Sequence, residues 1–111
     1  MSYDICLTID TGGDDPVEVP GTWINYTSNV AFMWRRALPE LDGLAGLDGR
    51  TAASVADLLA QGVLNMETLR PELEPLNPEN GWGNWMGARA TLAVCANAAR
   101  DHPKATFRVS R

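Results

Sequence analysis

Histidine and cysteine are scarce in this sequence. It contains one histidine and two cysteines, Cys6 and Cys95, and neither cysteine has a second one nearby. That count excludes a zinc site built on paired cysteines and a Cys-X-X-Cys redox motif. Two reduced, buried thiols are the favoured interpretation, and a Cys6–Cys95 disulfide is the alternative.

Clusters of basic residues and long apolar runs are also missing. The nine lysines and arginines are spread along the chain, and the net charge is −5. Nucleic-acid binding is disfavoured because it needs clustered cations. No apolar run approaches the roughly 20 residues of a membrane span, and residues 1–6 show no feature of a secretory signal. We therefore expect a cytoplasmic protein with no nucleic-acid or membrane partner and no cofactor or metal.

The overall composition is that of an ordinary globular domain. Hydrophobic residues make up 45% and charged residues 21% of the 111 positions. A chain of this length suffices for one hydrophobic core but not for two. We therefore expect a single domain over residues 1–111.

Alternation of apolar and polar residues predicts strands at both ends of the chain. The odd-numbered positions from Tyr3 to Ile9 are apolar, and so are those from Ala105 to Val109. Residues 17–27 resume an extended pattern that Pro20-Gly21 interrupts. This pattern predicts a hairpin near the start with a kink or bulge in its second strand, and a further strand at the end.

Helical spacing of apolar or small residues recurs in three segments, 30–38, 52–69 and 84–100. Gly62, inside the second, suggests close packing or a break. Pro71, Pro75 and Pro78 predict irregular structure between the second and third. The order β-β-α-α-α-β predicts an α+β fold, in which three helices pack on one face of a three-stranded, mainly antiparallel sheet.

Composition explains residues 77–86 least well. These ten residues combine three asparagines, two glycines, a proline and two of the four tryptophans. Asparagine, glycine and proline are typical of turns, but two large indoles beside them are not. We predict a rigid loop that leads into the last helix, with Asn84 as its N-cap.

A second polar-aromatic stretch, residues 25–29, lies between the hairpin and the first helix. Both stretches end at a helix N-terminus, where unpaired N–H groups favour an anionic ligand or a carboxylate of a partner. If they meet in space, they form a pocket or a recognition patch. Its candidate ligand-binding residues are Asn25, Tyr26, Thr27, Asn29, Trp34, Asn77, Asn80, Trp82, Asn84 and Trp85. The alternative is that the asparagines brace the loops while Trp82 and Trp85 fill the edge of the core.

Three segments of the chain resemble a known group of proteins. They are NYTSNVAFMW at residues 25–34, NPENGWGNWMG at 77–87 and HPKATFRVS at 102–110. In these segments the chain is similar to small, functionally uncharacterised proteins of actinobacteria and their phages. The resemblance implies a small cytoplasmic single-domain protein and implies no reaction.

Two further patterns have a functional and a plain interpretation. Asp10-Thr11-Gly12 looks like the active-site turn of a retroviral-type aspartic protease, but that fold is nearly all β and about half of this chain predicts helix. A hairpin turn is therefore favoured, and its acidic residues lack the spacing of an EF-hand calcium loop. His102, at the end of the last predicted helix, favours a capping role over a catalytic one.

The function expected from these patterns is a non-enzymatic binding module. Its ligand would be another protein or a small anionic molecule such as a nucleotide, and a phage-type protein would use it to inhibit a host or defence factor. The alternatives are an assembly component that associates through its sheet and a dimeric hydrolase that uses Asp10. Oligomeric state and strand order are left open.

Overall fold

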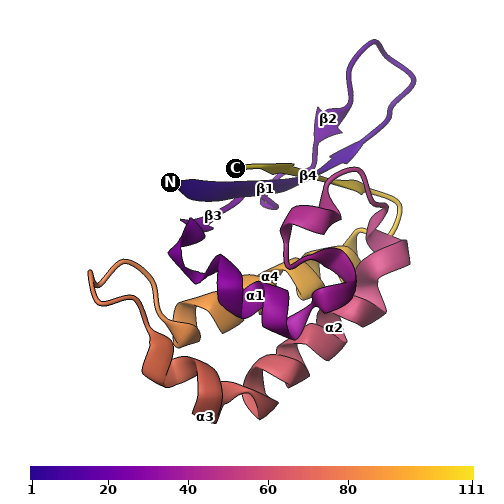
Figure 1. Ribbon diagram of the computed structural model, residues 1–111. Coiled ribbons are helices and arrows are strands. Elements are labelled where there is room, and N and C mark those ends of the chain that lie inside the picture. Colours follow the sequence, from indigo (N-terminus) through magenta and orange to yellow (C-terminus); the bar gives the residue numbers. More distant parts are fainter.

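The computed structural model describes residues 1–111 as an antiparallel sheet with every helix on one of its faces (Figure 1). The strands are β1 Ser2–Ile9, β2 Val17–Glu18, β3 Ile24–Thr27 and β4 Thr106–Ser110. The helices are α1 Ala31–Ala37, α2 Ala52–Thr68, α3 Arg70–Leu73 and α4 Trp85–Asp101. Short 3-10 turns are η1 Ser28–Val30, η2 Pro39–Leu41, η3 Ala45–Leu47 and η4 Glu74–Leu76. The predicted α+β class and the helices on one face are confirmed.

β1 is the central strand of the sheet. β4 pairs with one side of it, and both β2 and β3 pair with the other, because Ile5 has partners in β3 and β4 while Thr8 has partners in β2 and β4. The predicted second strand is therefore split in two, and the sheet has four strands rather than three. The split follows from the bulge at Pro20-Gly21. Next to this bulge, Leu7 N donates its hydrogen bond to the side-chain hydroxyl of Thr22, at 3.1 Å, and not to a backbone carbonyl.

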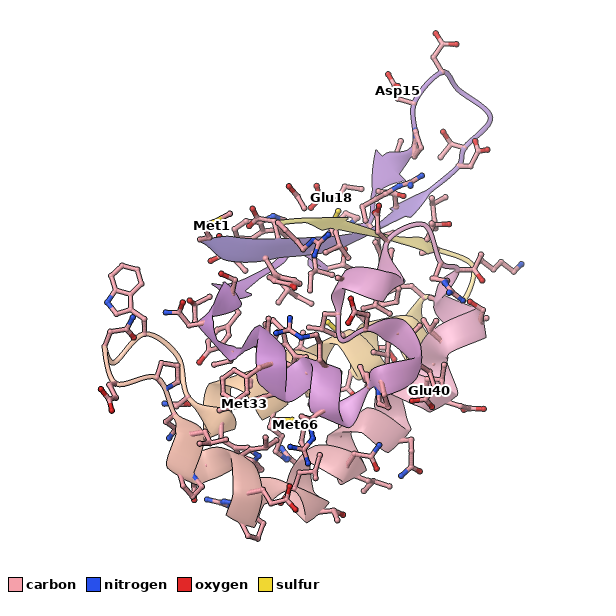
Figure 2. All side chains as sticks on the ribbon, viewed as in Figure 1. Met1, Asp15, Glu18, Met33, Glu40 and Met66 are labelled. Carbon is pink, nitrogen blue, oxygen red and sulfur yellow. The ribbon has the colours of Figure 1, made fainter.

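The core lies between the helices and the face of the sheet that they cover, which we call the inner face. Tyr3, Ile5, Leu7 and Phe107 point into it from the strands. From the helical layer come the predicted stripe on α1, three leucines of the connector at 41, 44 and 47, and residues of α2 and α4. Figure 2 shows two of them, Met33 and Met66, between the helices. Each such large apolar side chain stabilises the fold by about 1.5–3 kcal/mol.

Gly62 lies in the middle of α2 and does not break it. It is buried where α2 contacts α1 and α4, and a Cβ at this position would lie 2.7 Å from a methyl group of Leu38 and 3.3 Å from one of Leu92. Of the two predicted explanations for this glycine, close packing is the correct one.

The prediction of irregular structure throughout residues 71–81 was wrong. Pro71 lies in the first turn of α3, and Pro75 occupies the same position in η4. Proline is tolerated there because first-turn N–H groups have no partner within the helix. The chain therefore has four helices, the third a single short turn.

The segment between β1 and β2 projects from the body as an arm, with Asp15 near its tip (Figures 1 and 2). Asp10 Oδ1 accepts a hydrogen bond from Gly12 N at 2.8 Å, and Gly12 has φ +84°. The Asp-Thr-Gly triplet thus forms part of an exposed hairpin turn, as its favoured interpretation predicted. No helix of the protein is both long and apolar enough to cross a membrane.

Candidate functional site

The two predicted polar-aromatic stretches lie side by side. Asn29 Nδ2 donates to Trp82 O at 3.3 Å, and the Tyr26 hydroxyl accepts from Asn84 N at 3.3 Å. The approach requires glycine at position 83, because a Cβ there would lie 2.5 Å from a methyl group of Thr27, and because φ is +91°. Residues 53 or more positions apart in the chain are thereby joined into one site.

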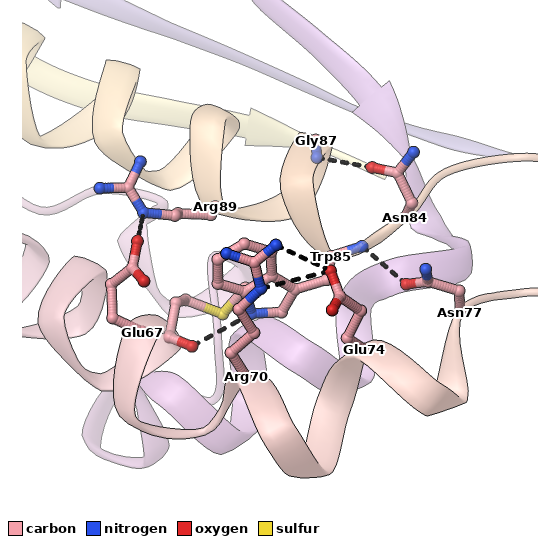
Figure 3. A network of polar contacts seen from close by, with 9 residues as sticks. Glu67, Arg70, Glu74, Asn77, Asn84, Trp85, Gly87 and Arg89 are labelled. Atoms are coloured by element: carbon pink, nitrogen blue, oxygen red, sulfur yellow. Dashed lines mark hydrogen bonds and ion pairs between the residues drawn. The ribbon is translucent and has the colours of Figure 1, made fainter.

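Three asparagines brace the second stretch by accepting backbone N–H groups. Asn77 accepts from Trp85 at 2.8 Å, Asn80 from Trp82 at 2.9 Å and Asn84 from Gly87 at 2.7 Å (the first and last are drawn in Figure 3). Asn84 is the predicted N-cap of α4. Two of these bonds use N–H groups in the first turn of α4, and the third uses the N–H of Trp82 in the loop. The asparagines therefore hold the loop in shape, as the alternative interpretation proposed.

Trp85 is part of the core and does not line a surface site. Its side chain is 2% exposed, and its Nε1–H donates to Met66 O at 3.1 Å. The Arg70 guanidinium lies 4.3 Å from the ring centre and pairs with Glu74 at 3.1 Å (Figure 3). The assignment of Trp85 to a ligand site was therefore wrong, because its position at the start of α4 turns the indole inward.

Trp34 is likewise a core residue. It is fully buried, donates its Nε1–H to Ala88 O at 3.0 Å and meets the Tyr3 ring edge-on at 5.2 Å. The helical stripe that includes Val30 and Leu38 already places it on the buried side of α1. Its inclusion in the candidate site was wrong for that reason.

Trp82, in contrast, is 68% exposed. A hollow of about 360 Å³ lies beside it, lined by Met1, Ser2, Asn25, Thr27 and Trp82. We call this the Trp82 hollow. Three of its five lining residues belong to the predicted set, and the amide of Asn25 is fixed by donating to Asp4 Oδ1 at 2.7 Å and Ser2 Oγ at 3.2 Å.

Figure 1 shows that no helix covers one face of the sheet, which we call the outer face. A second hollow, of about 370 Å³, lies there. Asp4, Trp23 and Arg108 are among its lining residues, and Asp4 forms the link to Asn25 of the Trp82 hollow. Trp23 is 61% exposed and was missed by the sequence analysis. The sequence signal for this position is the alternation of strand residues between the two faces. Thr22 and Ile24 turn inward, so Trp23 between them lies on the outer face.

Neither cysteine is prepared for nucleophilic chemistry. Both are free thiols, and burial raises the pKa of Cys95 to about 12. The pKa of Cys6 is raised by partial burial and by the Glu18 carboxylate, against the opposing effect of Arg108. Because the thiolate is the reactive form, both side chains are protonated at neutral pH and react slowly.

The remaining ionisable groups do not gather into a metal site. No group of three histidine, cysteine or acidic side chains is arranged to hold a metal ion. His102 is the C-cap residue of α4, where its backbone N–H donates to Ala98 O at 2.9 Å. Of the hollows on the surface, the two described above are the ones lined by a tryptophan.

Comparison with protein-family models, curated proteins and solved structures finds no match to this chain.

Proposed function

We propose that this chain is a non-enzymatic binding module that recognises another protein through Trp82 and the Trp82 hollow. The observation behind the proposal is a large indole that is 68% exposed on a loop whose backbone is hydrogen-bonded at Trp82, Asn84 and Trp85. An exposed tryptophan on a disordered tail would carry no such weight. Tryptophan is enriched among the residues that dominate binding energy in protein interfaces.

The loop holds Trp82 in place before any partner arrives. The backbone N–H of Trp82 donates to the side chain of Asn80, and the carbonyl of Trp82 accepts from the side chain of Asn29. The side chains of Asn77 and Asn84 accept N–H groups at the start of α4. A residue whose backbone is already held loses little backbone conformational entropy on association. The hydrogen bonds to the asparagines therefore fix the backbone that presents the exposed indole to a partner.

A protein partner fits this site better than a small anion does. The N–H groups of Trp85 and Gly87 at the start of α4 are bonded to asparagine side chains. No lysine or arginine lines the Trp82 hollow. Anion sites in proteins rest on free N–H groups or cationic side chains, so the geometry supports the protein partner over the nucleotide.

The resemblance to actinobacterial and phage proteins supports a cytoplasmic host protein as the partner. Binding through Trp82 would then act by occupying a surface of that host factor, which is how a small module without catalytic groups inhibits a larger protein. The alternative within this proposal is an assembly role, in which the same surface binds a second copy of the chain or a structural protein.

The test compares Trp82→Ala with Leu64→Ala, a matched control because Leu64 is 60% exposed on α2, outside both hollows. Proteins captured from an actinobacterial lysate are quantified by mass spectrometry. We expect Leu64→Ala to retain the partner and Trp82→Ala to lose it about 30-fold, as for a hot-spot residue worth 2 kcal/mol. Equal capture by both variants would refute the proposal.

A titration with nucleotides, followed by tryptophan fluorescence, separates the two ligand classes. A saturable change in wild type that disappears in Trp82→Ala would replace the protein partner by a small anionic ligand. A flat titration is the expected result.

A further inference from the structure

Helices α2 and α4 lie side by side and run in opposite directions (Figure 1). At one end of this helix pair, Glu67 near the end of α2 forms an ion pair with Arg89 near the start of α4 (Figure 3). At the other end, Asp57 near the start of α2 and Arg100 near the end of α4 line one hollow. Each end of the pair therefore carries one acidic side chain on α2 and one basic side chain on α4.

The hollow, of about 290 Å³, is a groove between the two helices that opens to solvent, and we call it the α2–α4 groove. Most of its lining residues are apolar, and these are Ala56, Ala60, Val63, Ala93 and Ala96. Because side chains at the contact set the distance between packed helices, such small residues let a helix of another chain approach closely.

The apolar face of α4 continues beyond the groove. Met86 and Ala90 precede Ala93 at helical spacing, so the three side chains lie on one side of the helix. Ala90 is exposed, and Met86 is 66% exposed. A large exposed apolar side chain that extends an apolar groove is typical of a surface that contacts another protein.

The charges at the Asp57 end of the groove are not paired with each other. Asp57 forms no ion pair within the chain. The only carboxylate near Arg100 is that of the adjacent Asp101, at 3.9 Å, and the side chain of Arg100 is 73% exposed. An acidic and a basic side chain on opposite walls of the groove are therefore available to a surface with the complementary arrangement.

A second copy of the chain has that arrangement. With a two-fold axis along the groove, α2 of one copy lies on α4 of the other, and equivalent ends of the two helix pairs meet. Asp57 then faces Arg100 of the second copy, and Arg100 faces its Asp57. At the far end, Glu67 and Arg89 face each other across the interface in the same way.

The other two-fold axis that superimposes the helix pairs runs across the groove. It places α2 on α2 and α4 on α4, with opposite ends together. Asp57 then faces Glu67 and Arg100 faces Arg89, so like charges meet at both ends, which is unfavourable. The charge pattern therefore selects the axis along the groove.

The size of the surface sets the strength of the contact. Each of the two helices has 17 residues. At a rise of about 1.5 Å per residue, each is about 25 Å long, and two helices of about 10 Å diameter present about 500 Å². A dimer would bury about 1,000 Å² in total, near the lower limit for a specific interface, so we expect it to form reversibly.

We infer that two copies of this chain associate through the α2–α4 groove, with the two-fold axis along the groove. The inference goes beyond the proposed function and does not depend on it, because no residue of the Trp82 hollow lines this groove. Burial of the apolar side chains drives the association, and the Asp57–Arg100 pairs between copies set its orientation.

The first experiment measures the mass of the wild-type protein by analytical ultracentrifugation. Concentrations from about 1 to 500 μM cover the affinity expected of an interface of this size. The protein should show a reversible monomer–dimer equilibrium. A chain that stays monomeric at the highest concentration would overturn the inference.

The second experiment uses Asp57→Arg and Arg100→Asp, alone and mixed. Each variant alone brings like charges together at two places in the dimer, so each should dimerise at least about tenfold more weakly than wild type. In the mixture, the new arginine of one variant faces the new aspartate of the other, and the remaining Arg100 faces the remaining Asp57. The mixture should therefore form a heterodimer about as strong as the wild-type dimer. A mixture no stronger than its components would exclude the proposed arrangement.

Asp15→Arg is the control for net charge. It changes the charge of the protein by the same amount as Asp57→Arg does, but Asp15 lies near the tip of the arm, away from the helices (Figure 2). This variant should dimerise as wild type does. A loss as large as that of Asp57→Arg would show that overall charge governs association, and the groove would lose its role.

A third comparison tests the apolar part of the groove. Ala60 and Gln61 are neighbouring exposed residues of α2, but only Ala60 lines the groove. Glutamate is a good helix former, so Ala60→Glu and Gln61→Glu should both fold. Ala60→Glu should weaken dimerisation at least about tenfold, because it places a charge in the apolar contact, and Gln61→Glu should not. Equal dimerisation of the two variants would show that the groove is not the interface.

Discussion

Trp82 and Trp85 lie three positions apart in one loop, yet the first is 68% and the second 2% exposed. The N-cap Asn84 separates them. After it, helical geometry turns residue 85 toward the core, whereas before it Gly81 and Gly83, both with positive φ, direct the chain outward. The same side chain is therefore part of the core at one position and faces solvent at the other, and the backbone around it decides which.

The strongest test of this contrast is Trp85→Ala. The change empties a core position, removes the donor to Met66 O and leaves Arg70 without the ring that it covers. The free energy of unfolding should fall by about 3–5 kcal/mol, measured by urea denaturation. Trp85→Phe, which keeps much of the volume, should lose less. A loss below about 1 kcal/mol in Trp85→Ala would contradict the burial of this side chain.

Asn84→Ala removes the cap that separates the two tryptophans. The side chain accepts from Gly87 N at 2.7 Å, and losing such a cap costs about 1 kcal/mol, with a range of roughly 0.5–2. Thermal unfolding measures the change. Asn84→Asp keeps the acceptor and should be close to wild type. If Asn84→Ala and Asn84→Asp unfold alike, the cap does not stabilise α4.

Trp82→Ala should have the smallest effect on stability of the three changes. Because the side chain is mostly in solvent, the free energy of unfolding should change by no more than about 0.5 kcal/mol, while capture of the partner is lost. Urea denaturation of the same protein preparation that is used for capture makes the comparison direct. A destabilisation above about 2 kcal/mol would show that Trp82 is a structural residue like Trp85.

Much of the fold follows from patterns that involve only neighbouring residues. The alternation from Tyr3 to Ile9, the stripe on α1, the extent of α4 and its cap at Asn84 were all predictable, because each depends on residues within a few positions. The errors arose where a local rule has exceptions. Proline interrupts a helix when it lies in the interior, but it is tolerated in the first turn. Pro71 lies in the first turn of α3.

The candidate site was only partly predictable. The two stretches were identified by composition, but they were treated as uniform, so Trp34 and Trp85 were included and Trp23 was left out. For Trp34 and Trp23, the helical and strand periods were sufficient to assign each to its face. For Trp85, the outcome depended on where α4 begins and on what packs above it, namely Met66 and Arg70.

Residue patterns thus decide where the helices and strands of this protein form and which sides of them are apolar, since these properties depend on backbone geometry over a few residues. The contact of Asn29 with Trp82, across 53 positions, depends on how the helices pack on the sheet. The same holds for the edges. The edge of β4 is closed because Asp48 and Arg50 are brought to it from another part of the chain, and Gly83 is brought against Thr27 of β3 in the same way. Neither contact is encoded in the strands themselves.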